Sequence, residues 1–283
     1  MITRLALLHR LKDELHALGL QAEVESTYRL IAEHIYAAPY PVLYADAHNE
    51  ATPEQIEQQT HILAALATGA PLQYILGQAY FFNRPFRVTT DTLIPRPETE
   101  ELCDLVLKHL PKQRPLLGLD LCTGSGCIAI TLALETAQCE MEALELSHAA
   151  LHVAQENARQ LDAKIAFIEA DLYTWEGGEN SYDFIVSNPP YIPQAEAASL
   201  SRRVHDFEPH LALFVPSEAP TRPYRRIAYL ATRLLKPGGF VACEIYETLG
   251  AETAAEFTQA GMEGVRLYRD FAGKERIVFA TKG

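Results

Sequence analysis

From residue 116 onward, short apolar runs alternate with amphipathic helical segments, and this alternation constrains the fold more than any other feature. Strands are predicted at residues 116–121, 142–145, 164–169, 182–187 and 240–246. Helices are predicted at residues 127–136, 147–161, 221–235 and 248–260. Such alternation is typical of a parallel sheet with helices on its faces. Two last strands, 264–270 and 275–281, have only a short turn between them and are expected to form an antiparallel hairpin.

The chain before this region follows a different pattern. Leucines recur at helical spacing over residues 5–18, and a second helix is expected over residues 23–37. Thr52 to Gln55 form a capping box that begins a third helix. Aromatic and β-forming residues follow, with a turn expected at residues 83–85. We therefore predict a helical domain over 1–75, a connecting β-hairpin over 76–95 and an α/β domain over 96–283, in which residues 192–220 are irregular.

Composition limits the kind of partner. The chain has a net charge of −13 and a pI near 5.2, which disfavours a surface that follows nucleic-acid phosphates. Its five cysteines form no CxxC pair, so we expect neither a metal site nor a disulfide framework. The first residues lack the apolar core of a signal peptide, and no apolar run is long enough to cross a membrane. These features predict a cytoplasmic protein that binds neither nucleic acid nor a membrane.

Polar and small residues follow the first three strands of the α/β pattern. A turn of small residues would let the backbone approach a ligand at the first of these strand ends; it consists of Cys122, Thr123, Gly124, Ser125 and Gly126. Glu145 ends the next strand, where an acid accepts hydrogen bonds from ribose hydroxyls. Asp171 is expected to accept from an adenine amino group, with Leu172 against the ring. Asp120 suits an ammonium group better than a pyrophosphate. A nucleoside joined to an amino acid indicates S-adenosylmethionine.

A second constellation follows the strand predicted at 182–187. Asn188, Pro189, Pro190 and Tyr191 combine a side-chain carbonyl, a stiff backbone and an aromatic face. Because prolines hold φ near −65° and have no N–H, the carbonyls of this loop are fixed to receive donors from another molecule. A planar NH2 group fits that requirement. An ordinary Asn-Pro turn that closes a strand is the alternative interpretation.

These motifs resemble those of class I methyltransferases that act on planar amino groups. Three further stretches narrow the resemblance to the HemK/PrmC family of protein-(glutamine-N5) methyltransferases, namely residues 93–100 (LIPRPETE), 207–209 (FEP) and 269–276 (RDFAGKER). The resemblance implies a Rossmann-like, seven-stranded, mostly parallel sheet with a small helical domain in front of it. It also implies methyl transfer from S-adenosylmethionine to the glutamine of the GGQ loop in class I peptide chain release factors. Cys122 departs from the family, which usually has glycine there.

The resemblance assigns roles to individual residues. Asn188, Pro189 and Tyr191 would be catalytic, and together with Pro190 they would bind the glutamine. The cofactor would be bound by Asn188 and by the residues of the three strand ends, which are Cys122, Thr123, Gly124, Ser125, Gly126, Glu145, Asp171 and Leu172. The helical domain would help to seat the release factor, and the family resemblance suggests a monomer.

Three other functions share part of this pattern. Adenine-N6 DNA methyltransferases present the same Asn-Pro-Pro-Tyr sequence to a flipped base, but they need a basic surface that this acidic chain lacks. A glutamine methyltransferase acting on a ribosomal protein is separated less cleanly by sequence. A non-catalytic scaffold that binds the cofactor is a third alternative, which a turnover assay would distinguish.

Overall fold

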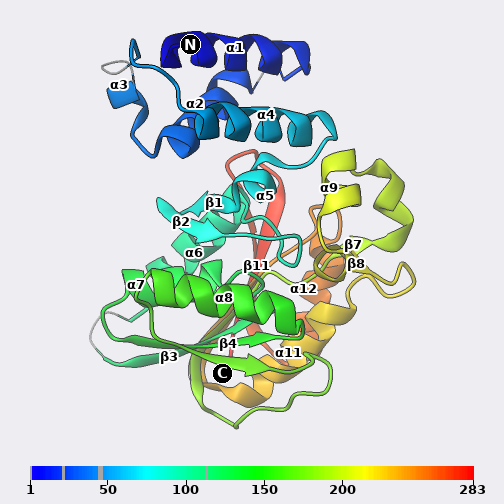
Figure 1. The fold of residues 1–283 in the computed structure, drawn as a ribbon. Coiled ribbons are helices and arrows are strands. Elements are labelled where there is room, and N and C mark those ends of the chain that lie inside the picture. Colours follow the sequence, from blue (N-terminus) through cyan, green and yellow to red (C-terminus); the bar gives the residue numbers. More distant parts are fainter. Residues whose placement is uncertain (1, 21–22, 44–46, 112–113) are drawn as a thin grey trace. The chain divides into compact units, whose positions relative to one another are not determined.

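The computed structural model describes residues 2–20, 23–43, 47–111 and 114–283 and divides the chain into two compact units, residues 1–78 and 79–283 (Figure 1). Each unit has a hydrophobic core of its own. Within the described ranges, no helix is both long and apolar enough to span a bilayer.

The first unit is a bundle of short helices. They are α1 (Arg4–Ala17), α2 (Val24–Tyr36), α3 (Tyr40–Leu43), α4 (Pro53–Ala67) and α5 (Leu72–Leu76). Leu11 and Leu15 of α1 pack against Tyr28 and Ile31 of α2 and Ile62 of α4, all of them buried. The apolar spacing therefore places one stripe of each long helix in a common core.

The start of α4 follows the predicted capping box. Thr52 accepts a hydrogen bond from the Gln55 N–H, and the Gln55 side chain accepts one from the Thr52 N–H. Pro53 occupies the first helical position, where its missing N–H costs no hydrogen bond. Tyr74 lies in the short helix α5.

A two-stranded sheet follows, made of β1 (Gln78–Phe81) and β2 (Arg84–Arg87). The turn lies at Phe82 and Asn83, whose φ angles are 51° and 59°, and not at residues 83–85 as the sequence suggested. Two positive φ angles in a two-residue loop match the twist of a hairpin. A proline is tolerated in β2 because an isolated pair of strands consists only of edges.

The second unit is built on a seven-stranded sheet in the order β10-β11-β9-β6-β3-β4-β5. The strands are β3 (Leu116–Leu121), β4 (Cys139–Glu145), β5 (Ile165–Glu169), β6 (Tyr182–Ser187), β9 (Leu235–Glu244), β10 (Glu263–Arg269) and β11 (Glu275–Thr281). β3 to β6 and β9 are parallel, whereas β11 runs antiparallel to both β9 and β10. The predicted closing hairpin and the mostly parallel sheet are both confirmed.

Helices cover both faces of this sheet (Figure 1). α6 (Pro97–His109), α7 (Cys127–Glu135) and α8 (His148–Gln160) share one core with Phe184 and Phe240 of the sheet. α11 (Arg222–Leu234) and α12 (Gly250–Gln259) share the other core with Ile185 and Val241. Successive residues of a strand point to opposite faces, so β6 and β9 contribute to both cores. This three-layer arrangement leaves the carboxyl ends of the parallel strands for a site.

Two predicted details of this unit are wrong. Residues 192–215 are not irregular but contain β7 (Ile192–Pro193), the 3-10 helix η1 (Gln194–Ser199), α9 (Arg202–Phe207), α10 (His210–Leu213) and β8 (Phe214–Val215). These elements are too short for a hydrophobic period to reveal them. The strand expected at 240–246 is β9, which already begins at Leu235 and ends at Glu244, and its register with β6 jumps from Leu235 to Phe240.

Candidate active site

A cavity of about 260 Å³ lies at the carboxyl ends of β3, β4, β5 and β6. Residues that immediately follow these four strands line it, as the strand order predicts for an α/β sheet. Of the residues predicted from sequence, the cavity brings together Cys122, Thr123, Gly124, Ser125, Glu145, Asp171, Leu172, Asn188 and Pro190. Gly126, Pro189 and Tyr191 are not among the residues that line it.

The turn after β3 has the backbone conformation of a close ligand approach. Gly124 has a φ of 55°, and a side chain added there would meet no atom within 4 Å, so the missing Cβ leaves space in the cavity. Cys122 has a φ of 63°, in the left-handed region that L side chains rarely adopt. Glycine adopts this φ without strain, which explains why the HemK/PrmC family usually has glycine at this position. Cys122 adopts it at a cost of about 1 kcal/mol in folding free energy.

Gly126 serves packing, although we predicted it to contact the cofactor. Its φ is 82°, and an added Cβ would lie 3.0 Å from the Ile130 side chain and 3.1 Å from Ala154. Glycine therefore suits both the positive φ and the close approach of the start of α7 to α8.

Asp120 is fully buried and does not line the cavity, so its predicted contact with an ammonium group is wrong. One of its oxygens accepts hydrogen bonds from the Thr123 hydroxyl at 2.6 Å and the Ala129 N–H at 3.2 Å. Its other oxygen has no partner among the described residues. The carboxyl group therefore fixes the turn and the start of α7 from behind. Burial raises the pKa of Asp120 to about 7.

This raised pKa predicts a pH-dependent stability. The folded chain keeps the Asp120 proton up to about pH 7, whereas the unfolded chain loses it near pH 4, so stability should fall as pH rises between these values. The expected contribution is about 1.4 kcal/mol of unfolding free energy per pH unit. Asp120→Asn should remove it. Urea unfolding followed by fluorescence of Trp175, the single tryptophan, measures the difference. Parallel pH profiles for both proteins would contradict the assignment.

Glu145 ends β4, and 9% of the residue is exposed. One oxygen of its carboxylate accepts the N–H groups of Leu146 and Ser147, each at 2.9 Å. The other accepts the Gly124 N–H, also at 2.9 Å. These three backbone donors hold the acid at the cavity wall and tie it to the glycine turn. Asp171 stands two residues beyond β5, with Leu172 beside it in the lining.

Asn188 and Pro190 line the cavity, and Asn188 and Tyr191 are each fixed by a hydrogen bond to a neighbouring element. The Asn188 Nδ2 donates to the Thr99 hydroxyl at 3.1 Å. Tyr191 donates its hydroxyl to Glu244 at 3.0 Å, and its ring stacks on Tyr246 with centroids 5.9 Å apart. Burial raises the pKa of Tyr191 well above its ordinary value, so its hydroxyl remains a donor.

Several lining residues come from segments for which the sequence predicts no role in the site. Thr99 and Arg96 belong to the LIPRPETE stretch, and Pro209 follows Glu208 in the FEP stretch. Arg96 forms an ion pair with Glu208, which is 4% exposed, and this pair joins two walls of the cavity. The two prolines that flank Arg96 indicate a loop of fixed shape. Glu208, the ion-pair partner of Arg96, lies 112 residues away in sequence, so no local pattern indicates the pair.

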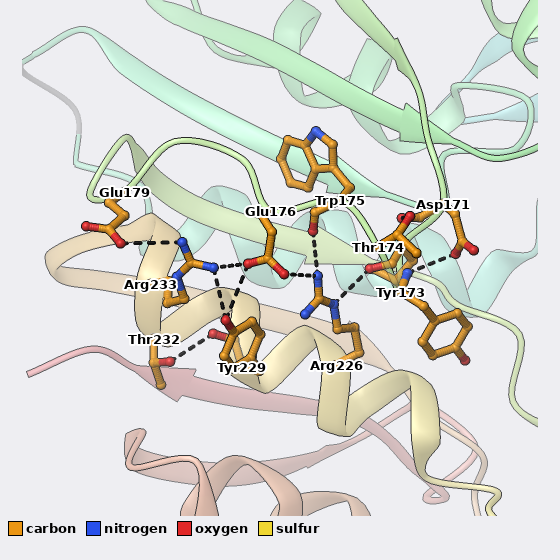
Figure 2. Close-up of polar contacts among 11 residues, drawn as sticks. Asp171, Tyr173, Thr174, Trp175, Glu176, Glu179, Arg226, Tyr229, Thr232 and Arg233 are labelled. Carbon is orange, nitrogen blue, oxygen red and sulfur yellow. Dashed lines mark hydrogen bonds and ion pairs between the residues drawn. The ribbon is translucent and has the colours of Figure 1, made fainter.

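The segment after Asp171 is fixed to α11 by two arginines (Figure 2). Arg226 donates to the main-chain carbonyls of Leu172 and Trp175, at 2.9 and 2.6 Å, and forms an ion pair with Glu176. The side chain of Arg233 contacts the carboxylates of Glu176 and Glu179 in this segment and none of its described main-chain groups. The backbone that carries Leu172 to the cavity is thus held by Arg226.

The charge of the cavity distinguishes between ligands. Its lining contains the acids Asp91, Glu145 and Asp171, and its one arginine, Arg96, is already paired with Glu208. Phosphate sites use unpaired cations or a concentration of backbone donors, and here Glu145 takes the Gly124 N–H. Acids at two neighbouring strand ends, an apolar wall and an open glycine fit a nucleoside that carries positive charge.

Comparison with known proteins agrees with this geometry. Residues 6–77 match the family model described as PrmC N-terminal domain, and residues 98–206 match that described as Methyltransferase small domain. A release factor glutamine methyltransferase of Bacteroides thetaiotaomicron is 44% identical over 78% of this chain and 80% of its own length. One from Flavobacterium psychrophilum is 37% identical over 91% of this chain and 92% of its own.

Solved structures support the fold. A methyltransferase from Pyrococcus furiosus superimposes with a TM-score of 0.51 at 17% identity, covering 80% of this chain and 98% of the other. At this identity the likeness concerns the arrangement of strands and helices.

Proposed function

Because this chain belongs to the release factor glutamine methyltransferase family, we propose that it methylates the side-chain amide nitrogen of the glutamine in the GGQ loop of class I peptide chain release factors. The methyl donor is S-adenosylmethionine. The observation that carries this proposal is a single cavity lined by the turn after β3, by Glu145 and Asp171, and also by Asn188. The acids that suit a positively charged nucleoside and the Asn188 side chain that suits an amide therefore line the same cavity.

We assign the cofactor to the strand-end residues. Gly124 leaves room for close approach, Glu145 accepts hydrogen bonds from the ribose hydroxyls, and Asp171 accepts from the adenine amino group while Leu172 packs on the ring. Cys122, Thr123, Ser125 and Asn188 complete the lining, and Gly126 acts through helix packing. When bound, S-adenosylmethionine supplies a methyl group activated by a positively charged sulfur.

The loop after β6 positions the glutamine. An amide nitrogen is a poor nucleophile because its lone pair is delocalised into the carbonyl. We assign the Asn188 Oδ1 and the Pro189 carbonyl as acceptors for its two N–H groups, so that the nitrogen is oriented and the charge that develops on it is stabilised. Pro190 keeps these acceptors rigid, and Tyr191 packs against the amide plane. A protonated N-methyl amide is very acidic, so water suffices to take its proton.

The helical unit, residues 1–78, is the proposed docking surface for the release factor. Its apolar side chains form its own core, which leaves charged side chains such as Glu14, Arg29 and Glu54 for contacts with a partner. We further propose that the enzyme acts as a monomer in the cytoplasm, where release factors function. The net charge of −13 favours a protein substrate over a nucleic acid.

Arg226→Gln should weaken the binding of S-adenosylmethionine about tenfold, because two carbonyl partners of the segment that carries Leu172 lose a charged donor. Trp175 lies in that segment, so its fluorescence should also change in the free protein. Isothermal titration and an emission spectrum measure the two effects.

Arg233→Gln is the matched control. It removes a guanidinium of the same helix that pairs with Glu176 and Glu179 and that, among the described residues, makes no hydrogen bond to the main chain of this segment. Its effect on affinity should be small, since exposed ion pairs contribute little. Equal losses in both variants would show that general loosening, and not the Arg226 contacts, is responsible.

The proposal is tested with tritiated S-adenosylmethionine and a purified class I release factor, either intact or with the GGQ glutamine changed to alanine. Label in the intact factor alone is the expected result. Cofactor binding without label in either factor would reject the substrate, and a ribosomal protein and then duplex DNA would be tried next.

A further inference from the structure

A buried acid lies behind the Asn188 loop without lining the cavity. Glu244 is the last residue of β9 and is 1% exposed. One of its carboxylate oxygens accepts the Thr99 hydroxyl at 2.6 Å, and the other accepts the Tyr191 hydroxyl at 3.0 Å. Thr99 in turn accepts from the Asn188 Nδ2. Glu244 is therefore connected to both ends of the Asn188–Tyr191 loop.

The chemistry of these groups fixes the direction of the chain of hydrogen bonds. An ionised carboxylate can only accept, so the single hydroxyl proton of Thr99 is donated to Glu244. What remains on the Thr99 oxygen is a lone pair, which can bind the NH2 end of the Asn188 amide but not its carbonyl end. The Asn188 Oδ1 is thereby left without a partner among the described residues, at a position that lines the cavity.

We propose that Glu244 is a positioning residue that, through Thr99, presents the carbonyl oxygen of Asn188 to the substrate amide. This inference rests on the proposed function. In the opposite orientation, Asn188 would direct its NH2 group at the NH2 group of the glutamine, and two donors would face each other. The hydrogen bonds from Thr99 to Glu244 and from Asn188 to Thr99 thus determine which end of the Asn188 amide faces the cavity, and we call this pair of bonds the relay.

Packing alone does not account for an acid at this place. Taking a carboxylate out of water is costly, and an apolar side chain of similar volume often fills such a site without loss of stability. Burial raises the pKa of Glu244, while the hydroxyls of Thr99 and Tyr191 and the charge of Arg276 oppose the shift. The two hydroxyls and Arg276 stabilise the ionised form on which the relay depends, whereas burial and the charge of Glu98 favour the protonated form.

A double-mutant cycle tests the relay. Thr99→Val removes the hydroxyl at constant volume, and it should lower kcat about tenfold or more because Asn188 loses the partner that orients it. Glu244→Met should lower kcat at least as much, since the freed Thr99 hydroxyl can donate to the Asn188 Oδ1. In the Glu244→Met background, Thr99→Val should lower kcat by less than about threefold, because the relay is already broken. Thr99→Ser, which keeps the hydroxyl, should restore most of the activity that Thr99→Val loses.

A purely structural role predicts other results. The dissociation constant of S-adenosylmethionine should stay close to the wild-type value in these variants, whereas general disorder would weaken it together with kcat. Additive losses in the cycle, or equal losses in Thr99→Val and Thr99→Ser, would overturn the relay.

A second readout requires no substrate and separates failure of the relay from failure of the proposed function. The side-chain NH2 signals of Asn188 in an NMR spectrum, assigned by their loss in Asn188→Ala, should shift in Thr99→Val and in Glu244→Met. Unchanged signals would overturn the relay even if the wild-type enzyme methylates the release factor.

Discussion

Replacing Asn188 by alanine is expected to lower kcat about 100- to 1000-fold, the usual effect of removing one preorganised polar group from a transition state. The variant loses the acceptor assigned to the glutamine amide. Binding of S-adenosylmethionine should change little, because Glu145, Asp171 and the turn after β3 remain in place. Single-turnover rates with saturating release factor, together with cofactor titration, separate the two effects.

Asn180→Gly is a suitable control for this variant. Asn180 has a φ of 50°, which glycine adopts without strain, and its exposed side chain contacts Lys282 alone among the described residues. The control should turn over at the wild-type rate. If Asn188→Ala lowers cofactor affinity as much as kcat, the assigned role of Asn188 in orienting the amide is wrong.

Glu145→Gln should weaken S-adenosylmethionine binding about 10- to 100-fold, equivalent to roughly 1.4–2.8 kcal/mol. The carboxylate accepts three backbone N–H groups, and an amide can accept through only one of its two ends. The NH2 end of the introduced glutamine would face either the Gly124 N–H or the N–H groups of Leu146 and Ser147, which places donor against donor. The substitution also removes one acceptor for the ribose hydroxyls. At saturating cofactor, kcat should approach the wild-type value.

Glu169→Gln provides the matched comparison. Glu169 is paired in register with Glu145 on the neighbouring strand, but it is exposed, contacts His148 and does not line the cavity. Its substitution should leave cofactor affinity unchanged. Similar losses in both variants would mean that charge at this sheet edge, and not the contacts of Glu145, controls binding.

The parts of the fold that a local sequence pattern determines are predictable from the sequence. The strand at 116–121, its turn of small residues and the strand at 182–187 were predicted because apolar runs, glycines and prolines act within a few residues. The order of parallel strands then brought Glu145, Asp171 and Asn188 to one cavity. The family resemblance added the substrate, which no local pattern gives.

The contacts missed from sequence are long-range ones. Glu244 bonds Thr99 across 145 positions, and Arg226 bonds the Leu172 carbonyl across 54. No periodicity relates such residues, and each of them alone is typical of an ordinary helix or strand. Asp120 was misassigned for the same reason: its position before the turn suggested a ligand contact, but its direction into the interior depends on how α7 packs.

The most direct test of the account is to identify the methylated atom. After reaction of wild-type enzyme with an intact release factor, peptide mass spectrometry should find one added methyl group on the side chain of the GGQ glutamine. The same experiment with Asn188→Ala, at a cofactor concentration that saturates it, should find almost none. A methyl group on another residue, or equal modification by both enzymes, would contradict the central claim that Asn188 orients this amide for methyl transfer.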